Sequence, residues 1–565
     1  MAQPNRESDA PLGGGGVGEP VEVAAVAAPL EDAPVPSTLA GTLRTMFLIA
    51  APSVVTMTSY SAMQFIDRMM VKEIGPEPKY IAAQGTAGIT TWTLMTFCVG
   101  LTGVVSSFVS QNLGAGKPAR GAAYAWASMW IGLGYWLAIM VPAAIFARSF
   151  FGLYGHEEEV LTLEVEYATI AMGGAVFTLM SKGLHNYFFG LHKPAIVAIA
   201  VVLGNLTNVF ANAVLIFGPD GLELGPAPES WWGGVAWAVM VPVLDAAAWV
   251  AQTLGISAMG LAGAALGTVI GTVVEWGVPF LAFIAPRHNR TFRSRAAWRP
   301  ASLMFKDIAR VGWPAGLMFL NELVLWGYMM SYLTPRAAER AAQAAGAAGE
   351  AVKEAGTYAT TTGFIALQWM HLSFMPAVGI SIATQAMVGK ALGARRPEDA
   401  ARTTWLGLGI TMAYMGACGV FFVIFARPLI GFFINTDTPP AEAERMIVLG
   451  AQIMIAAAVF QLFDAMAITT SAALRGAGDT VWPGVATIVT SWLFIFGLGH
   501  LLIGVAPGIG ALSPWIGAAA YICALGILLT ARFLGGKWRK IRLVHDDAIH
   551  NLPPDQMAPG TSPGA

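Results

Sequence analysis

Residues 461–483 of the chain have the sequence QLFDAMAITTSAALRGAGDTVWP. The stretch begins inside a long apolar segment that holds one isolated carboxylate, Asp464, and it ends in a glycine-rich turn with Arg475 and Asp479. A carboxylate at bilayer depth costs about 2.5–3.5 kcal/mol on insertion scales, so it is rarely kept unless it faces a cavity or a cation. Asp464 is therefore a candidate functional residue if this segment crosses a membrane.

The composition of the whole chain indicates that it does. Of the 565 residues, 56% are hydrophobic and 12% are charged, and the mean hydropathy is +0.61. Apolar runs of roughly 20 residues recur along the chain between short polar breaks, which is typical of spanning helices and not of a β-barrel. We predict an all-α polytopic membrane protein with about twelve transmembrane helices.

Several other classes are disfavoured by the same composition. The net charge is -2, so no strongly basic face favours nucleic acid as a partner. The three cysteines, Cys98, Cys418 and Cys523, are far apart in apolar runs, which predicts neither a metal site nor a disulfide framework. No GxxxxGK[ST] or HExxH motif and no GxS-type nucleophile with a catalytic partner is found, so we expect neither direct use of ATP nor an enzyme. A scaffold without transport activity would leave the buried acids without a task.

Loop charge predicts the topology, because Lys and Arg are retained on the cytoplasmic side. Most basic residues fall on the side of the N-terminus only if residues 219–255 do not span. We therefore expect a cytoplasmic (inner) membrane protein with both termini in the cytoplasm. The predicted parts are a disordered tail (1–41), a six-helix lobe (42–286) with an outer-face re-entrant or interfacial insertion (219–255), a basic linker (287–308), a second six-helix lobe (309–535) with an Ala-rich outer excursion (335–356), and a C-terminal tail (536–565).

An internal repeat supports the two lobes. SQNLGAGKPARGAAYAW (110–126) and GKALGARRPEDAARTTW (389–405) share LGA, a following proline and a closing Trp, at an offset of 279 residues. FFGLHKPA (188–195) and LRGAGDTVWP (474–483) form a second pair, at an offset of 286 residues between Gly190 and Gly476. Six helices are an even number, so both halves start on the same side, and such parallel repeats bind substrate between the lobes.

The segments QNLGAGKPARGA, KALGARRPEDAAR, LRGAGDTVWP, VGWPAGLMFLNELVL and NLTNVFANAVLIFG resemble the multidrug and toxic compound extrusion family, in its NorM-like branch. The resemblance covers about residues 42–535. It implies a secondary active exporter that exchanges hydrophobic or cationic organic compounds for Na+ or H+ by a rocking motion of the lobes. It also implies a monomer with no cofactor. The alternative is a lipid-linked saccharide flippase of the same superfamily, which would be expected to have a basic central cavity.

The C-terminal lobe holds the first predicted coupling site. Glu322 is the only carboxylate of its helix, and the resemblance implies that it shares a cavity with Asp464, where both would take up a proton or Na+. Gln461, three residues before Asp464, offers a second oxygen on the same helical face. The structural alternatives are an Asp464 bonded to a neighbouring helix and a Glu322 paired with a buried base. We expect no base at the depth of Glu322.

Asp67 forms a possible N-terminal counterpart with Asn205, Asn208 and Asn212, which are spaced i, i+3 and i+7 on one helical face. Where the family usually has Asp-Thr in the first helix, this chain has Asp67-Arg68, and an ion pair between these two would hold Asp67 ionised. The alternative is that the asparagines only bond helices together.

The remaining polar residues are weaker candidates. They are Glu275, Asp245, Gln368 and His371, with Arg475 and Asp479 assigned to the structure of the turn.

Overall fold

The computed structural model describes residues 35–75, 79–222, 231–434 and 438–544, so most of the two predicted tails lies outside the described residues. Within these ranges the chain is helical and contains no strand, and twelve helical segments are long and apolar enough to cross a membrane. The all-α polytopic prediction is confirmed.

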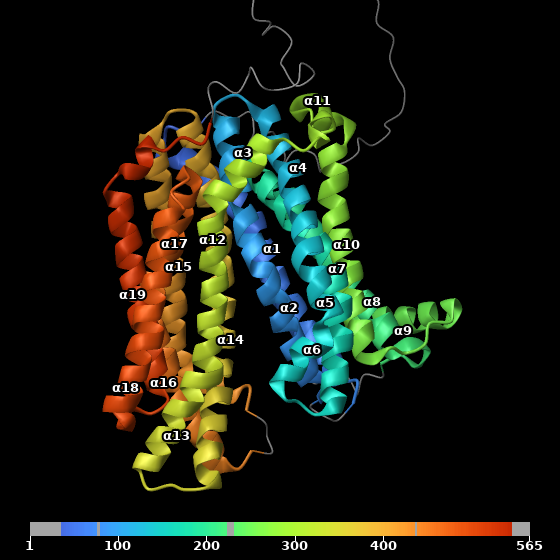
Figure 1. Cartoon of the computed structure of the whole chain (residues 1–565), viewed down its shortest axis with the longest axis vertical. Coiled ribbons are helices and arrows are strands. Elements are labelled where there is room, and N and C mark those ends of the chain that lie inside the picture. Colours follow the sequence, from blue (N-terminus) through green and yellow to red (C-terminus); the bar gives the residue numbers. More distant parts are fainter. Residues whose placement is uncertain (1–34, 76–78, 223–230, 435–437, 545–565) are drawn as a thin grey trace, which may run out of the picture.

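Six of the spanning segments form the first lobe (Figure 1). They are α1 (Leu39–Lys72), α2 with α3 (Lys79–Gly103 and Val105–Gly114), α4 with η2 and α5 (Pro118–Tyr135, Trp136–Met140 and Val141–Ile145), α7 (Glu158–Gly190), α8 (Pro194–Phe217) and α10 (Gly260–Ile284). The short elements α6 (Ala147–Phe151), η3 (Gly152–Tyr154) and η4 (Gly218–Asp220) join them.

The other six form the second lobe. They are α12 with η6 and α13 (Ser302–Tyr328, Met329–Leu333 and Thr334–Ala344), α14 (Glu350–Gly393), α15 (Pro397–Gly431), α16 (Pro440–Ala477), α17 with η7 and α18 (Val481–Ser491, Trp492–Leu498 and Gly499–Val505) and α19 (Leu512–Leu534). The elements η8 (Pro507–Ile509) and η9 (Lys537–Lys540) are short. Each lobe has its own buried apolar core, because its helices turn their apolar faces toward one another.

Two predicted boundaries shift in the structure. The linker at 287–308 contains α11 (Pro286–Phe292) and η5 (Ala296–Trp298), but α12 already begins at Ser302. The Ala-rich stretch at 335–356 is no separate helix: α12 continues through a π-helical turn into α13, which ends at Ala344, and α14 starts at Glu350.

The ambiguous segment 219–255 contains a seventh apolar helix of the first half, α9 (Trp231–Leu254). It packs against α8 and η4 and projects sideways from the lobe, across the direction of the spanning helices (Figure 1). Residues 223–230 lie outside the described residues. A helix in this orientation does not span with the others, while its position on the outer face stays a prediction.

Four turns at one end of the bundle share one backbone geometry. A residue with positive φ follows the helix in each of them, and the next residue donates its N–H to a carbonyl five positions earlier, which is the Schellman way to end a helix. The positive-φ residues are Gly116 (71°), His192 (61°), Arg395 (59°) and Gly478 (93°), and the bonds run from residues 117, 193, 396 and 479 at 2.8–2.9 Å. These are the turns of the two repeat pairs, so the duplication extends to the backbone.

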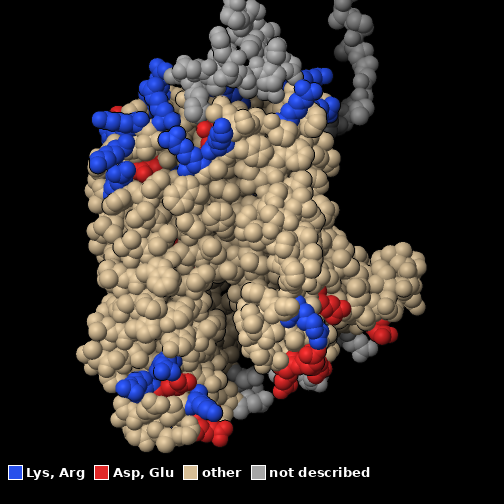
Figure 2. All heavy atoms as spheres, viewed as in Figure 1, with Lys and Arg blue, Asp and Glu red and all other residues tan. Residues whose placement is uncertain are grey.

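We call the end with these turns the basic end, because Lys117, Arg395 and Arg542 lie there beside a large group of other Lys and Arg side chains (Figure 2). The lobes are joined at this end: Gln111 of α3 donates to the carbonyls of Gly476 (3.0 Å) and Ala477 (3.2 Å) of α16. Toward the opposite end the lobes separate, and the surface is hollowed between them (Figure 2). We call this hollow the central cleft.

Candidate functional site

The interior of the second lobe brings Glu322 and Asp464 together. The Tyr521 hydroxyl of α19 donates to Oε1 of Glu322 on α12 at 2.9 Å, and the Tyr521 side chain is buried. Asp464 on α16 is half-buried and close enough to Glu322 and Tyr521 for their charges to interact. Three helices thus supply two carboxylates and a phenol to one interior site.

Gln461 is not part of this site. Its amide donates to the Ser373 hydroxyl of α14 at 2.9 Å, and the side chain is 2% exposed. The i, i+3 spacing places Gln461 and Asp464 on neighbouring parts of one helical face. Because α14 packs against this face, the Gln461 amide bonds to Ser373 and not to Asp464. No hydrogen bond between them occurs among the described residues.

Arg475 lies within electrostatic range of Glu322, where the sequence led us to expect no base at that depth, although no ion pair joins the two among the described residues. Its guanidinium donates to the Ser471 hydroxyl at 2.8 Å and is close enough to Glu322 for their charges to attract. Side chains on a helix point back toward its N-terminus, so an arginine at the basic end of α16 extends into the lobe. The depth of Arg475 was judged from the position of its Cα atom in the sequence, which does not account for the length of its side chain.

The interior of the first lobe joins Asp67 to two of the three asparagines. Nδ2 of Asn212 donates to Oδ1 of Asp67 at 2.8 Å and lies 3.5 Å from Oδ1 of Asn208. Asn208 in turn donates to the Thr268 hydroxyl of α10 at 3.2 Å. Thr268 was missed because a threonine in an apolar helix usually bonds only its own backbone, as Thr268 also does to Ala264.

Asn205 points elsewhere. It donates to the backbone carbonyl (3.0 Å) and hydroxyl (2.7 Å) of Ser59 on α1, so it bonds two helices together, as the alternative interpretation proposed. Of the three asparagines, Asn205 thus joins α8 to α1, whereas Asn208 and Asn212 belong to the cluster around Asp67.

Arg68 does not pair with Asp67 among the described residues. Consecutive helical side chains differ in direction by about 100°, so Asp67 turns into the lobe, where it is 8% exposed, while Arg68 is exposed on another face of α1. Instead of the predicted ion pair with Arg68, Asp67 accepts a hydrogen bond from the side-chain amide of Asn212.

A second polar cluster in the first lobe has Glu275 at its centre. Oε1 of Glu275 on α10 lies 3.1 Å from Nζ of Lys182 on α7 and accepts a hydrogen bond of 2.5 Å from Tyr60 on α1. His185 Nδ1 lies 3.8 Å from the same oxygen. A Lys and a Glu inside two apolar spans were the sequence signal that could have predicted this ion pair.

Both interior acidic sites have the chemistry of a hard-cation or proton site, because their donors are oxygens. In the first lobe, Oδ1 of Asn212 is buried beside Asp67 and has no hydrogen-bond partner among the described residues, so it is available to a cation. No group of three His, Cys, Asp or Glu side chains with metal-binding geometry occurs in the described ranges. The donor sets therefore fit Na+ or H+ better than a transition metal.

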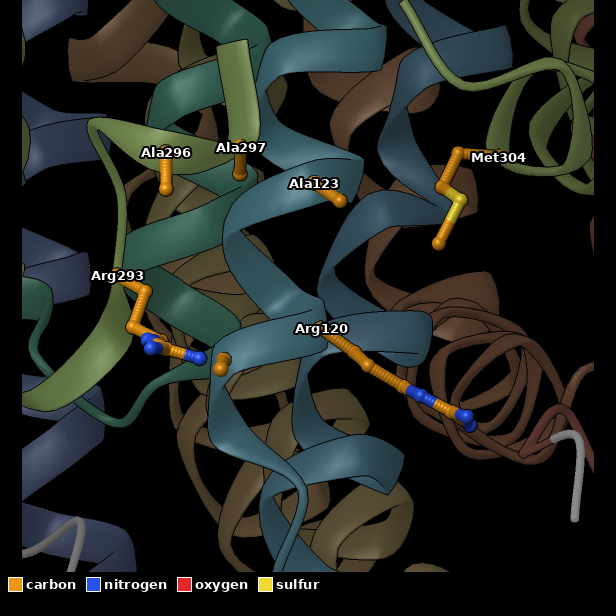
Figure 3. A pocket seen from close by; sticks show the side chains of 7 residues that line it. Arg120, Ala123, Arg293, Ala296, Ala297 and Met304 are labelled. Carbon is orange, nitrogen blue, oxygen red and sulfur yellow. The ribbon is translucent and has the colours of Figure 1, made fainter. Parts of the chain in front are cut away.

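Two half-open pockets lie away from these acids. One, of about 40 Å³ at the basic end, is lined by Arg120, Arg293 and Met304 among others (Figure 3). It is large enough for water but not for an organic compound. A larger one of about 410 Å³ lies where the lobes meet, beside Gln111 and Gly393. Neither touches Asp464, Glu322 or Asp67, so the central cleft is the better candidate for the substrate.

Comparison with known proteins agrees with this architecture. The sequence model of the MatE family matches residues 52–214 and 351–499. The chain is 28% identical over 492 residues to a probable multidrug resistance protein NorM of Deinococcus radiodurans, covering 87% of the chain and 95% of the relative. It is 27% identical over 491 residues to the probable NorM of Burkholderia pseudomallei, covering 86% and 91%.

Solved structures show the same fold. A structure described as the outward-facing conformation of a multidrug resistance MATE family transporter of the MOP superfamily superposes with a TM-score of 0.72 at 19% identity, over 88% of this chain and 97% of that one. A MATE crystal structure in the straight conformation gives a TM-score of 0.70 at 20% identity, over 88% and 97%. Because the family model matches more than half of the residues, one segment in each lobe, the chain belongs to the MatE family, the NorM-like transporter family that its sequence resembles and not a family of enzymes.

Proposed function

We propose that the protein is a secondary active multidrug exporter of the inner membrane, working as a monomer that exchanges hydrophobic or cationic organic compounds for Na+ or H+. The observation that carries this proposal is the Glu322–Asp464 site, where two carboxylates interact inside one lobe. A role in holding helices together would not by itself favour two carboxylates, which carry like charges, inside an apolar lobe.

The site suggests how ion and drug exclude one another. Glu322 and Asp464 repel each other when both are ionised. A proton or a sodium ion that binds between them removes this repulsion and so stabilises the second lobe. A compound bound in the central cleft would favour the opposite state of the lobes, so binding of the compound promotes release of the ion and binding of the ion promotes release of the compound. Each monovalent cation that moves inward contributes about 2.3 kcal/mol per 100 mV of membrane potential.

Alternating access follows from the separation of the lobes at only one end. With the basic end in the cytoplasm, the central cleft opens outward in this structure. Rocking about the junction at Gln111 would close the cleft and open the basic end. The Asp67 site, which is not neutralised by Arg68, would serve as a second coupling site.

Efflux of a fluorescent organic cation from proteoliposomes tests the proposal. The wild-type protein, Asp464→Asn and Glu322→Gln are compared under separately imposed Na+ and pH gradients. Asp245→Asn is the matched control, since Asp245 is exposed on α9. We expect gradient-driven export that both interior variants lose and the control keeps, and the active gradient identifies the ion. Export by both interior variants at the wild-type rate would show that Asp464 and Glu322 do not couple transport to an ion.

A lipid-linked saccharide flippase is the second candidate, and one observation favours it. Arg68, an exposed side chain of α1 near the other lobe, is basic, as the cavity of a flippase would be. A flippase would not need Glu322 and Asp464, so the first proposal accounts for more of the interior.

A further inference from the structure

Arg68 lies on the face of α1 that points toward the other lobe. Ala50 precedes it by eighteen residues, which is five full turns of an α-helix, so the two share a face. Ala50 is buried in a cluster with Ile380 and Met387 of α14. Further along α1 the lobes separate and Arg68 is exposed, so its side chain lines the central cleft.

The side chain of His371, in the other lobe, lies near that of Arg68. It belongs to α14, the helix that packs along α1, and it is half-buried. The guanidinium of Arg68 is close enough for its charge to act on the His371 imidazole. The two lobes thus bring one basic side chain each to the α1–α14 contact.

The acids of the helices at the lobe junction do not neutralise this charge. α1 has one acid, Asp67, and α2 has none. α12 has Asp307 and Glu322, and α14 has Glu350 and Glu354, of which Asp307, Glu350 and Glu354 lie near the starts of their helices. Asp67 is bonded to Asn212 inside the first lobe and Glu322 to Tyr521 inside the second. Among the described residues, no carboxylate lies within ion-pair distance of Arg68. Among these residues Arg68 therefore brings a positive charge to the cleft that no carboxylate pairs with, although each lobe has an acidic interior.

We propose that Arg68, assisted by His371, binds an anionic group of the transported compound, so that the substrates are amphiphiles that carry a carboxylate, sulfonate or phosphate. A guanidinium binds such groups with two parallel hydrogen bonds, which a lone ammonium cannot copy. Phe65, one turn earlier on α1, is 46% exposed and offers an apolar surface beside the charge. This substrate class refines the proposed export function and rests on it.

A matched pair of dyes tests the charge preference: a rhodamine with a free carboxylate and its methyl ester, which differ in that one charge. Binding of each to the purified full-length protein in detergent is measured by fluorescence polarisation. The variants are Arg68→Gln, Arg68→Lys and Arg68→Glu, with Arg340→Gln, an exposed arginine of α13, as the matched control.

We expect the wild-type protein and the Arg340→Gln control to bind the carboxylate dye more tightly than the ester. Arg68→Gln should weaken carboxylate binding about tenfold, the size of one lost charged hydrogen bond, and leave ester binding nearly unchanged. Arg68→Lys should lose less, and Arg68→Glu should reverse the preference. A reversal reports charge recognition, because a variant that only disturbed packing would weaken both dyes alike.

Competition identifies where the anionic group comes from. A soluble aromatic carboxylate and farnesyl diphosphate, which resembles a lipid diphosphate, are each titrated against the bound dye and, by calorimetry, against the free protein. Binding of the diphosphate alone that depends on Arg68 would favour the flippase, and binding of the carboxylate would favour a drug exporter.

The inference is wrong if no anionic ligand binds the wild-type protein more tightly than Arg68→Gln. That outcome is separate from failure of the export proposal, which is judged by gradient-driven transport in liposomes and not by binding in detergent.

Discussion

Gly114 and Gly393 occupy matching positions in the two lobes, and each lies against the backbone of the other's turn. A Cβ on Gly114 would lie 2.0 Å from the carbonyl oxygen of Lys390, and a Cβ on Gly393 would lie 2.0 Å from that of Gln111. Lys390 and Gln111 are themselves 279 residues apart, the offset of the repeat. The junction at the basic end is therefore a two-fold contact that requires glycine on both sides.

Gly114→Ala should open this junction. The clash is with backbone atoms, which cannot rotate away, so the closed arrangement should lose about 1–3 kcal/mol, as in other overpacked sites. Reactivity of a cysteine in place of the buried Ser110 toward a soluble maleimide measures the opening. Gly134→Ala is the control, since a Cβ there meets nothing within 4 Å. Equal reactivity in both variants would contradict the two-fold contact.

Leu543 should hold the same junction from the C-terminal side. Its N–H donates to Oε1 of Gln111 at 3.0 Å, and its buried side chain packs on Gly478. Leu543→Asp places a charge in this apolar contact and should raise the same cysteine reactivity. The exposed neighbour Arg542 provides the control variant Arg542→Gln, which should leave it unchanged. A lack of effect of Leu543→Asp would mean that this segment only rests on the junction.

Tyr521→Phe should impair ion coupling more than drug binding. The phenol is the one hydrogen-bond donor to Glu322 among the described residues, and a bond to a charged group is worth about 1.5–3 kcal/mol. The apparent affinity for the coupling ion should fall by about tenfold or more in a transport assay, while drug binding in detergent should stay close to wild type. Tyr358→Phe, near the start of α14, is the matched control. Unchanged ion affinity in Tyr521→Phe would place Tyr521 outside the coupling site.

Lys182 and Glu275 should behave as one unit in unfolding measurements. Removing one member of a buried ion pair leaves an uncompensated charge and costs about 3–5 kcal/mol, whereas removing both is much less costly. Glu275→Gln and Lys182→Met should each lower the thermal unfolding midpoint in detergent, and the double variant should recover most of the loss. Additive losses would show that the two charges do not depend on each other.

His288 should make the protein less stable in acid. This residue lies on α11, outside the spanning segments, where burial and the nearby charge of Lys193 lower its pKa from 6.5 to about 3. The unfolded chain then binds a proton that the folded one does not, so stability falls as the pH drops from about 6.5 toward 3, by at most about 1.4 kcal/mol per pH unit.

His288→Phe should remove this part of the acid sensitivity, which the unfolding midpoint measured from pH 7 to pH 4 would report. Arg299→Gln, at an exposed position of the same linker, is the control. An identical pH profile for wild type and His288→Phe would mean that other groups account for the acid effect.

The sequence predicted most of the fold because its signal is local. Each apolar run has to bury its backbone polar groups in a helix before it can enter lipid, so length and hydropathy alone define the spans. The asparagine spacing on α8 likewise predicted which side chains share a face, and Asn208 and Asn212 do lie together beside Asp67. The coupling roles of these residues stay predictions.

The partners across helices could not be predicted in the same way. Gln461 bonds Ser373, Asn205 bonds Ser59, and Arg475 extends toward Glu322, because packing decides which polar group of a neighbouring helix is nearest. Glu275 was judged a weak candidate for the same reason, since its partner Lys182 is 93 residues away in the chain.

By itself, then, the sequence determined twelve apolar helices, their duplication into two lobes and the presence of acids at membrane depth. Only the tertiary structure decided that Asp67 and Glu322 turn into their own lobes while Arg68 faces the cleft between them. The physical reason is that helical periodicity fixes the angle between two side chains on one helix. The direction in which that helix faces is set by its packing against segments hundreds of residues away.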